Sequence, residues 1–355
     1  MANSNLTSAK KAKNDEFYTQ YHDIEKEIGA YLEFNPDVFR NKTILMPCDD
    51  PEWSNFTKFF AQNFERFGLK KLISTSYAPD SKPYKNGYQP TLFELNDPQY
   101  DETKTIKNGK IFMLTKDKSG DGKIDVNDLE WTYLQGDGDF NSAEIKKLRD
   151  EADIIITNPP FSLFREFLAW IMEGEKQFLM IGNINIITYK EVFPLIKSNK
   201  AWLGTGMGRW ISGFIVPESY ELYGTEARVD AAGNRIVATN SCLWLTNIDH
   251  GKRHQPLALM STADNLRFNK KLKGITSYKV YDNYDAIDVP YTDAIPSDYD
   301  GVMGVPISFL DKYSPEQFEI LGCNRGIDQD PAKIYGRSSY IEGKETFKRI
   351  FIKHK

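Results

Sequence analysis

The chain has 355 residues, of which 40% are hydrophobic and 27% charged, and its formal net charge is −5. This length predicts two domains with a sizeable core, and the composition excludes a disordered or collagen-like chain. The apolar stretches are far shorter than the roughly 18 residues of a membrane helix, the N-terminus lacks the apolar run of an export signal, and the three cysteines form no CxxC pair. We therefore expect a cytoplasmic globular protein with no membrane partner, disulfide framework or structural zinc site.

The first eighty residues predict a βαβ unit. Residues 42–46 (KTILM) are typical of a short apolar strand, residues 55–67 (NFTKFFAQNFERF) carry aromatic side chains at helical spacing, and residues 71–77 (KLISTSY) predict the next strand. The region near 78–135 is rich in Pro, Gly and Asp and predicts an insertion or an elaborated hairpin. Such a unit indicates parallel strands joined by a crossover helix.

A second alternation of strands and helices follows the insertion. Residues 153–157 (DIIIT) predict a strand covered on both faces, residues 163–173 an amphipathic helix, residues 177–181 a strand, and residues 189–197 a further helix. The C-terminal third is less regular. The fold class expected is α/β, with a doubly wound, mostly parallel sheet.

Four residues, Asn158, Pro159, Pro160 and Phe161, lie where the buried strand ends and the next helix begins. In open α/β sheets, ligands bind at the carboxyl ends of the strands. The side-chain carbonyl of Asn158 and the backbone carbonyl of Pro159 can accept hydrogen bonds from an amino group, while Phe161 can stack on a flat substrate. A strand-ending turn with a core Phe is the alternative, which the flanking strand and helix disfavour. The motif predicts methylation of an amino group attached to a conjugated ring or a carbonyl.

These segments together resemble a known family, the EcoRI-type S-adenosylmethionine-dependent DNA adenine methyltransferases of restriction–modification systems. The resemblance covers nearly the whole chain, and its most specific segments are KNDEFYTQYHDIEKEI, CDDPEWSNF, GDGDF, DIIITNPPFSLFREF, GFIVPESYELYGTEAR and DYDGVMGVPISFL. Their order matches the gamma arrangement of amino methyltransferases. The resemblance implies a Rossmann-like methyltransferase domain at residues 1–248 that binds S-adenosylmethionine, and a DNA target-recognition region at residues 249–355.

The resemblance also implies roles for individual residues. Asn158 to Phe161 look like the catalytic motif. Phe17, Tyr18 and Thr19 look like the element beside the methionine moiety of the cofactor. Asp49, Asp50 and Pro51 resemble the cofactor loop after the first strand. Asp139 and Phe140 resemble the element that contacts the cofactor's adenine.

The cofactor loop departs from the family pattern DPxxGxG, because Ser54 and Phe56 stand at its glycine positions. From the residues alone, CDDPEWSNF is typical of an Asx-type turn before a helix. An acid after the second strand, often used to hold the ribose hydroxyls, is also missing from KLISTSY. GDGDF combines glycines for a tight turn with a carboxylate that could accept the cofactor's amino group, and a plain β-turn is its alternative.

Residues 117–128 (DKSGDGKIDVND) match a calcium loop, with oxygen-bearing residues at positions 1, 3, 5, 9 and 12 and glycine at position 6. The preceding KIFMLT predicts a strand rather than a helix, and the twelfth residue, Asp128, is shorter than the usual glutamate. Calcium binding and a polar hairpin tip both stay open, so no metal is assigned.

Basic residues cluster in the N-terminal arm and in the C-terminal third. Lys10, Lys11 and Lys13 have no acidic neighbour among the first thirteen residues, and further clusters lie at 252–273 and 333–355. A solvated face is the alternative for any one cluster. We take Lys10, Lys11 and Lys13 as candidate contacts to the phosphates of duplex DNA.

Together these patterns predict a site-specific adenine N6-methyltransferase that flips an adenine out of double-stranded DNA and methylates it from S-adenosylmethionine, as a restriction–modification methylase. A cognate restriction endonuclease acting on the same site, though not as a stable subunit, would be its functional partner. The alternatives are a methyltransferase of RNA or protein glutamine with the same motif, and a catalytically silent DNA-binding protein. The C-terminal region disfavours the first, and the intact motif disfavours the second.

Overall fold

The computed structural model describes residues 18–49, 54–78, 97–206, 211–216, 227–237, 241–326 and 330–355. The chain divides into two compact units. Unit 1 comprises Met1–Ile184 and Gly208–Ile248, and unit 2 comprises Asn185–Met207 and Asp249–Lys355. Unit 2 therefore combines the stretch 185–207 with the C-terminal region.

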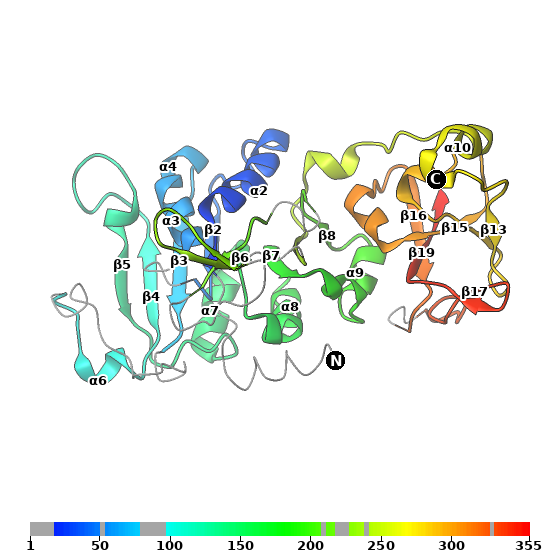
Figure 1. Ribbon diagram of the computed structural model, residues 1–355. Helices are drawn as coiled ribbons and strands as arrows, with labels where there is room; N and C mark the ends of the chain where they lie inside the picture. Colours follow the sequence, from blue (N-terminus) through cyan, green and yellow to red (C-terminus); the bar gives the residue numbers. More distant parts are fainter. Residues whose placement is uncertain are drawn as a thin grey trace. The chain divides into compact units, whose positions relative to one another are not determined.

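The centre of unit 1 is a mixed sheet with the strand order β5-β4-β3-β2-β6-β7-β12 (Figure 1). Its four middle strands run parallel and are β3 (Lys71–Ser76), β2 (Thr43–Met46), β6 (Ile154–Thr157) and β7 (Gln177–Asn183). The strands on both sides pair antiparallel and are β4 (Lys110–Leu114), β5 (Glu130–Tyr133) and β12 (Cys242–Thr246). The protein is thus of the mixed α/β class, with parallel strands at the centre of the sheet and antiparallel strands beside them.

The helices of unit 1 begin and end where the sequence provides caps. In α3 (Asn55–Gln62) the first turn is capped by Ser54, and α4 (Phe64–Phe67) ends at Gly68 in the left-handed conformation with φ +63°. The single helix expected over 55–67 is interrupted at Asn63, whose side chain donates to the carbonyl of Phe59 at 2.9 Å. The remaining helices of unit 1 are α2 (Tyr21–Phe34), α6 (Glu102–Thr105), α7 (Ala143–Glu151), α8 (Phe164–Glu173) and the short η2 (Val126–Asp128) and η3 (Phe161–Leu163).

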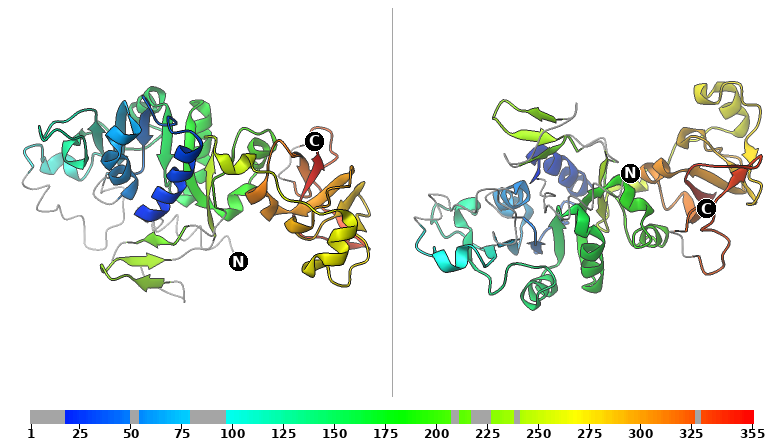
Figure 2. Two further views of the ribbon diagram at one scale, coloured as in Figure 1. Left: turned by 90° about the horizontal axis from the view of Figure 1, so that it is seen from above. Right: turned by 60° about the horizontal axis from the view of Figure 1, so that its bottom comes forward.

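Both faces of the parallel strands are buried. On one face, alternate residues such as Ile44, Met46, Ile154 and Ile156 form a single apolar cluster with the aromatic side chains of α2, α3 and α4. On the other face Ile155 and its neighbours are equally buried, and α7 and α8 lie on that side of the strands (Figures 1 and 2). Burial on both faces explains why the strand over 153–157 is continuously apolar.

The predicted insertion extends this sheet. Strands β4 and β5 continue it beyond β3, and the residues between them form a long hairpin loop. The predicted strand at KIFMLT is confirmed as β4.

A second, four-stranded antiparallel sheet in unit 1 has the order β1-β9-β11-β10. It joins the start of the described chain to residues about two hundred positions later, because Thr19 pairs with Phe214 and Tyr18 with Ile215. Its strands are β1 (Tyr18–Thr19), β9 (Phe214–Ile215), β11 (Arg235–Val237) and β10 (Ala227–Val229).

Unit 2 has a five-stranded sheet of its own, in the order β13-β14-β15-β19-β16. These strands are β13 (Lys279–Val280), β14 (Ala286–Asp288), β15 (Val302–Pro306), β19 (Arg349–His354) and β16 (Phe318–Cys323), and a hairpin of β17 (Tyr340–Ile341) and β18 (Lys344–Glu345) accompanies them. The other elements are short: η4 (Ile184–Thr188), α9 (Phe193–Lys197), β8 (Trp202–Leu203), η5 (Gly251–His254), α10 (Thr262–Phe268), η6 (Lys270–Leu272), η7 (Thr292–Ala294) and η8 (Ile307–Lys312). Among the residues that the structure describes, no helix is long and apolar enough to span a membrane.

Candidate active site

The candidate active site lies at the carboxyl ends of β2, β3 and β6. Because these strands are parallel, the segments that follow them meet at one edge of the sheet. The chain leaves β2 to form β3 on one side and returns to form β6 on the other, so the strand order reverses between β2 and β6. Open α/β sheets bind ligands at such a reversal point. The sequence places Asp49 after β2 and Asn158 after β6.

Asp49 connects these two strand ends. Its carboxylate is buried and accepts hydrogen bonds from the hydroxyl of Ser54 at 2.7 Å and from the hydroxyl of Thr157 at 2.7 Å. Its backbone carbonyl accepts from the hydroxyls of Thr57, at 2.9 Å, and Ser74. Since Thr157 immediately precedes the candidate catalytic motif, the loop after β2 is bonded directly to the base of that motif.

Burial has a large effect on the ionisation of Asp49. Loss of hydration raises the pKa of its carboxyl from 3.8 to about 7, although the hydrogen bonds from Thr157 and Ser54 favour the ionised form. Near neutral pH the carboxyl therefore exchanges between its charged and neutral forms. We therefore expect the contact between the two strand ends to respond to pH.

Ser54 explains the departure from the glycine pattern in the cofactor loop. Its hydroxyl oxygen accepts from the backbone N–H of Phe56 at 3.1 Å, and the same hydroxyl donates to Asp49. Phe56 is buried with its ring edge-on to Trp244, at a centroid distance of 5.9 Å. At these two positions this chain has a helix cap and a core residue.

The candidate catalytic motif, residues 158–161, follows directly on β6. Pro159 is buried, the side-chain oxygen of Asn158 is buried, and the carbonyl of Pro160 accepts from the N–H of Leu163 at 2.9 Å, which starts η3. Phe161 is half-buried, and its ring lies edge-on to Phe214 with centroids 6.0 Å apart. The ring of Phe161 thus packs against the apolar cluster on this face of the sheet and stays partly accessible to solvent.

The N-terminal element lies beside this motif. The side-chain amide of Asn55 donates to the carbonyl of Thr19 at 2.8 Å, and Thr19 pairs with Phe214, which contacts Phe161. Tyr18 continues the same strand pairing. The structure thus brings Thr19, Asp49 and the catalytic motif to one edge of unit 1.

Asp139 and Phe140, the predicted contacts to the cofactor's adenine, have surroundings that differ from each other: Asp139 lies near the end of β3, and Phe140 packs on α8. Asp139 lies close enough to the end of β3 that its charge, with that of Asp137, adds to the burial that raises the pKa of Tyr77 to about 12. Gly138 has φ +91°, and a Cβ there would approach the carbonyl of Ser76 to 2.5 Å, so the GDGDF turn requires glycine at this position. Phe140 is buried with its ring packed on those of α8.

Comparison with known proteins identifies the family. The family described as "Adenine-specific methyltransferase EcoRI" matches residues 5–355. The chain is 47% identical to the type II methyltransferase M.EcoRI of Escherichia coli, over 99% of this chain and 97% of that protein. It is 32% identical to M.MpnI of Mycoplasma pneumoniae and 33% identical to M.MgeORF184P of Mycoplasma genitalium, again over at least 97% of each chain. No solved structure matches it.

The chain belongs to the EcoRI adenine-specific methyltransferase family. It is an adenine-specific DNA methyltransferase of the type II restriction–modification class. The resemblance inferred from the sequence motifs is confirmed over nearly the full length.

Sequence reasoning missed several residues of this edge. It did not indicate Thr157, whose hydroxyl reaches Asp49 across 108 positions of the chain, or Phe214, which backs the ring of Phe161. Phe214 lies in the family segment GFIVPESYELYGTEAR, and that is the only sequence signal that pointed to it. The candidate residues Phe17, Asp50 and Pro51, with Lys10, Lys11 and Lys13, lie outside the described residues.

The calcium-like loop is the hairpin tip between β4 and β5. The carboxylate of Asp117 accepts from the N–H groups of Gly120 and Gly122 at 2.6 and 2.8 Å. That of Asp128 accepts from the N–H groups of Lys118, Ser119 and Asp125, which lower its pKa to about 2. Within the described ranges, no cluster of three or more potential metal ligands occurs. Backbone amides thus satisfy the two end carboxylates of the loop, which favours the polar hairpin tip.

Proposed function

We propose that this enzyme transfers a methyl group from S-adenosylmethionine to the exocyclic N6 amine of an adenine that it flips out of duplex DNA. The observation that carries the proposal is the hydrogen bond from Thr157 to Asp49. It joins the loop after β2 to the catalytic motif after β6 at the point where the strand order of the sheet reverses. A doubly wound, Rossmann-like methyltransferase fold has its cofactor and substrate side by side at this point.

The catalytic motif provides hydrogen-bond acceptors and a stacking surface. The exocyclic nitrogen of adenine is a poor nucleophile, because its lone pair is delocalised into the ring. The side-chain oxygen of Asn158 and the backbone carbonyl of Pro159 would each accept one of its N–H groups and direct the lone pair toward the methyl donor. Phe161 would stack on the base, with Phe214 behind it. Orientation of the amine is therefore the main contribution of the motif.

The residues that would hold the cofactor offer oxygen atoms that can accept hydrogen bonds from the amino groups of S-adenosylmethionine. When bound, S-adenosylmethionine supplies the electrophilic methyl group. Thr19 and Tyr18 lie beside the catalytic motif, and Asp139 offers a carboxylate near the end of β3. We assign Asp49 a positioning role, because both of its carboxylate oxygens already accept from Ser54 and Thr157. It holds the cofactor loop against the motif.

Unit 2 is proposed as the target-recognition unit, corresponding to the region predicted at 249–355. Contacts to base edges would select the sequence, and basic side chains, including the predicted arm lysines Lys10, Lys11 and Lys13, would contact phosphates. The enzyme would protect cytoplasmic DNA from a cognate endonuclease that reads the same site without forming a stable complex with it. Membership of the adenine-specific family disfavours protein glutamine as substrate.

Methylation mapping tests the proposal. Purified protein is incubated with S-adenosylmethionine and unmethylated plasmid DNA, and modified adenines are located by sequencing, with Asn158→Ala as the matched inactive control. We expect N6-methyladenine at one short recurring sequence, in duplex DNA only. Methylation of RNA in place of DNA, or equal activity of the control, would overturn the proposal.

A further inference from the structure

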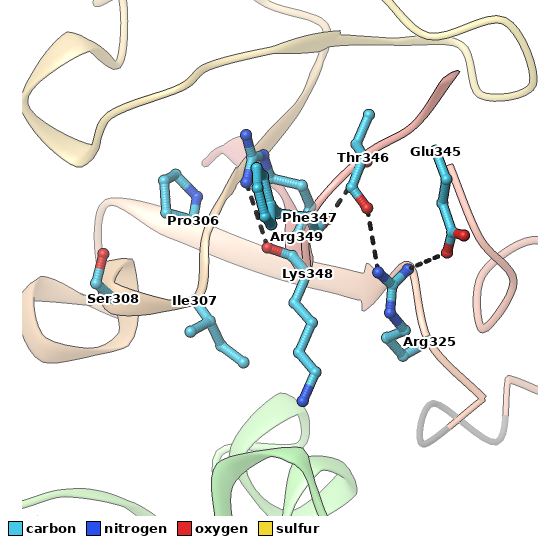
Figure 3. A pocket seen from close by; sticks show the side chains of 9 residues that line it. All are labelled: Pro306, Ile307, Ser308, Arg325, Glu345, Thr346, Phe347, Lys348 and Arg349. Atoms are coloured by element: carbon cyan, nitrogen blue, oxygen red, sulfur yellow. Dashed lines mark hydrogen bonds and ion pairs between the residues drawn. The ribbon is translucent and has the colours of Figure 1, made fainter. Parts of the chain in front are cut away.

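Unit 2 contains a pocket of about 710 Å³ beside the start of β19 (Figure 3). Three segments line it. The first is the end of β15 and the start of η8, the second is Arg325 after β16, and the third is the segment that joins β18 to β19. Its lining combines apolar side chains with three cations and one acid, namely Pro306, Ile307, Phe347, Arg325, Lys348, Arg349 and Glu345. The lining is therefore suited to a flat or apolar group that carries negative charge.

The most unusual feature of the pocket is the exposure of Phe347. Its side chain is 84% exposed, the highest value among the large hydrophobic side chains within the described ranges. Phe268, for comparison, is 60% exposed and has the guanidinium of Arg267 over its ring. A ring this exposed gains almost no burial from folding, so its contribution to the stability of the fold is small.

The backbone around Phe347 is firmly held. The buried side chain of Asn324 donates to the carbonyl of Phe347 at 2.8 Å and accepts from the N–H of Arg349 at 2.7 Å. It also donates to the hydroxyl of Ser339 at 2.7 Å. Asn324 thus fixes both ends of the Phe347–Lys348 step, so the exposed ring projects from a fixed backbone. A segment whose backbone is already fixed loses little backbone entropy on binding a partner.

The cations of the pocket are not equivalent. Arg349 is bound to Asp288 by a 2.8 Å hydrogen bond, and both side chains are nearly buried. Arg325 donates to the carbonyl of Thr346 at 3.1 Å and lies 3.4 Å from the carboxylate of Glu345. Lys348 has no ion pair within the part of the chain that the structure describes, and its side chain extends away from these groups (Figure 3). Lys348 is therefore the cation available to a ligand.

We infer that the segment 346–348 contacts duplex DNA, with Phe347 packed against a base or sugar in a groove and Lys348 against a phosphate. The inference rests on the proposed function, which supplies the duplex. DNA presents apolar ring faces and sugars beside regularly spaced negative charges, and this combination matches a projecting phenylalanine next to a lysine. The pairing of Arg349 with Asp288 shows that the acid of β14 is neutralised, so it does not repel a phosphate at the pocket.

Binding measurements on the full-length protein test the inference. The methylated sequence is first mapped with the wild-type enzyme, and labelled duplexes with and without that sequence are then titrated across a range of salt concentrations. The variants are Phe347→Ala and Lys348→Ala. The matched controls are Phe268→Ala, which removes a second exposed ring of unit 2, and Lys312→Ala, which removes an exposed lysine at the end of η8, outside the basic clusters.

The two variants should fail in different ways. Lys348→Ala should weaken binding to both duplexes by similar factors and flatten the slope of log affinity against log salt by about 0.9, the value for one lost phosphate contact. Phe347→Ala should lower the affinity for the specific duplex by roughly five-fold or more with the slope unchanged, because stacking and groove packing release no counterions. The controls should match the wild type.

The outcomes separate this inference from the proposed function. If the wild type methylates DNA while both variants bind as the controls do, the segment is not a DNA contact and only the inference fails. If Phe347→Ala instead changes the sedimentation of the protein without DNA, and affinity is unaffected, the surface joins copies of the chain and the inference is wrong. If the wild type methylates no adenine in DNA, the proposed function itself fails. Thermal unfolding confirms that each variant is folded.

Discussion

The catalytic edge of unit 1 and the segment 346–348 of unit 2 are each held in place by one buried polar side chain. In unit 1 it is Asp49, whose carboxyl joins Ser54 to Thr157. In unit 2 it is Asn324, whose amide joins Phe347 to the N–H of Arg349. The amide is neutral at every pH, whereas burial raises the pKa of the Asp49 carboxyl to about 7. The segment 346–348 should therefore be insensitive to pH, and the candidate active site of unit 1 should respond to it.

The largest effect is expected at the catalytic motif itself. Asn158→Ala should lower the rate of methyl transfer by about a hundred-fold or more, because it removes an acceptor that orients the amine in the transition state. Affinity for DNA and for S-adenosylmethionine should stay close to that of the wild type, since the Asp49–Thr157 contact is left intact. Single-turnover methylation measures the first effect, and direct titration measures the second. Wild-type turnover would remove Asn158 from the mechanism.

The position of this motif was predictable from sequence for a simple physical reason. A strand buried on both faces is continuously apolar, so the segment DIIIT predicted where the strand ends. Asn158 is the first residue after that strand. The helix over 55–67 was predicted from its aromatic spacing, but its break at Asn63 depends on one side-chain hydrogen bond. Such a bond leaves no periodic signal.

Contacts between distant parts of the chain were not predictable in the same way. In the sequence, Thr157 is recognisable only as the last residue of a predicted strand. Its hydrogen bond to Asp49 depends on the pairing of β2 with β6. The stretch 185–207 belongs to unit 2 through tertiary packing, although it directly follows the parallel strands. Unit 2 has short strands and many single-turn helices, which carry too few residues for periodicity to be seen.

Asp49→Asn tests whether the stability contributed by the Asp49 contact in unit 1 depends on pH. The folded protein holds a proton on Asp49 more tightly than the unfolded chain does, so the stabilising contribution is complete below pH 3.8 and is lost as pH rises through about 7. Relative to the variant, the wild type should lose stability over this window, by up to roughly 1.4 kcal/mol per pH unit. Chemical denaturation at a series of pH values checks this. A constant difference between the two proteins across the window would show that Asp49 does not titrate there.

Asn324→Ala is the matching test in unit 2. Removing the amide leaves the carbonyl of Phe347 and the N–H of Arg349 without their buried partner, which should cost about 1–3 kcal/mol of stability. The loss should be the same at about pH 5 and about pH 8, because the amide does not ionise. Measuring denaturation at both pH values tests the contrast with Asp49. A loss that differed between the two pH values would show that the hydrogen bonds of the Asn324 amide are not the main contribution of this residue.

The smallest effect is expected at the hairpin tip, where the pKa of Asp128 is shifted in the opposite direction to that of Asp49. Backbone N–H groups surround the carboxylate of Asp128 and lower its pKa to about 2, so it stays ionised without a metal. Calcium would have to displace these hydrogen bonds and those that Asp117 accepts from Gly120 and Gly122. The melting temperature should therefore be the same in excess calcium and in chelator, while Asp128→Asn should lower it equally in both. If calcium raised the melting temperature of the wild type and not of the variant, the loop would be a metal site after all, because only ion binding to the folded state produces that difference.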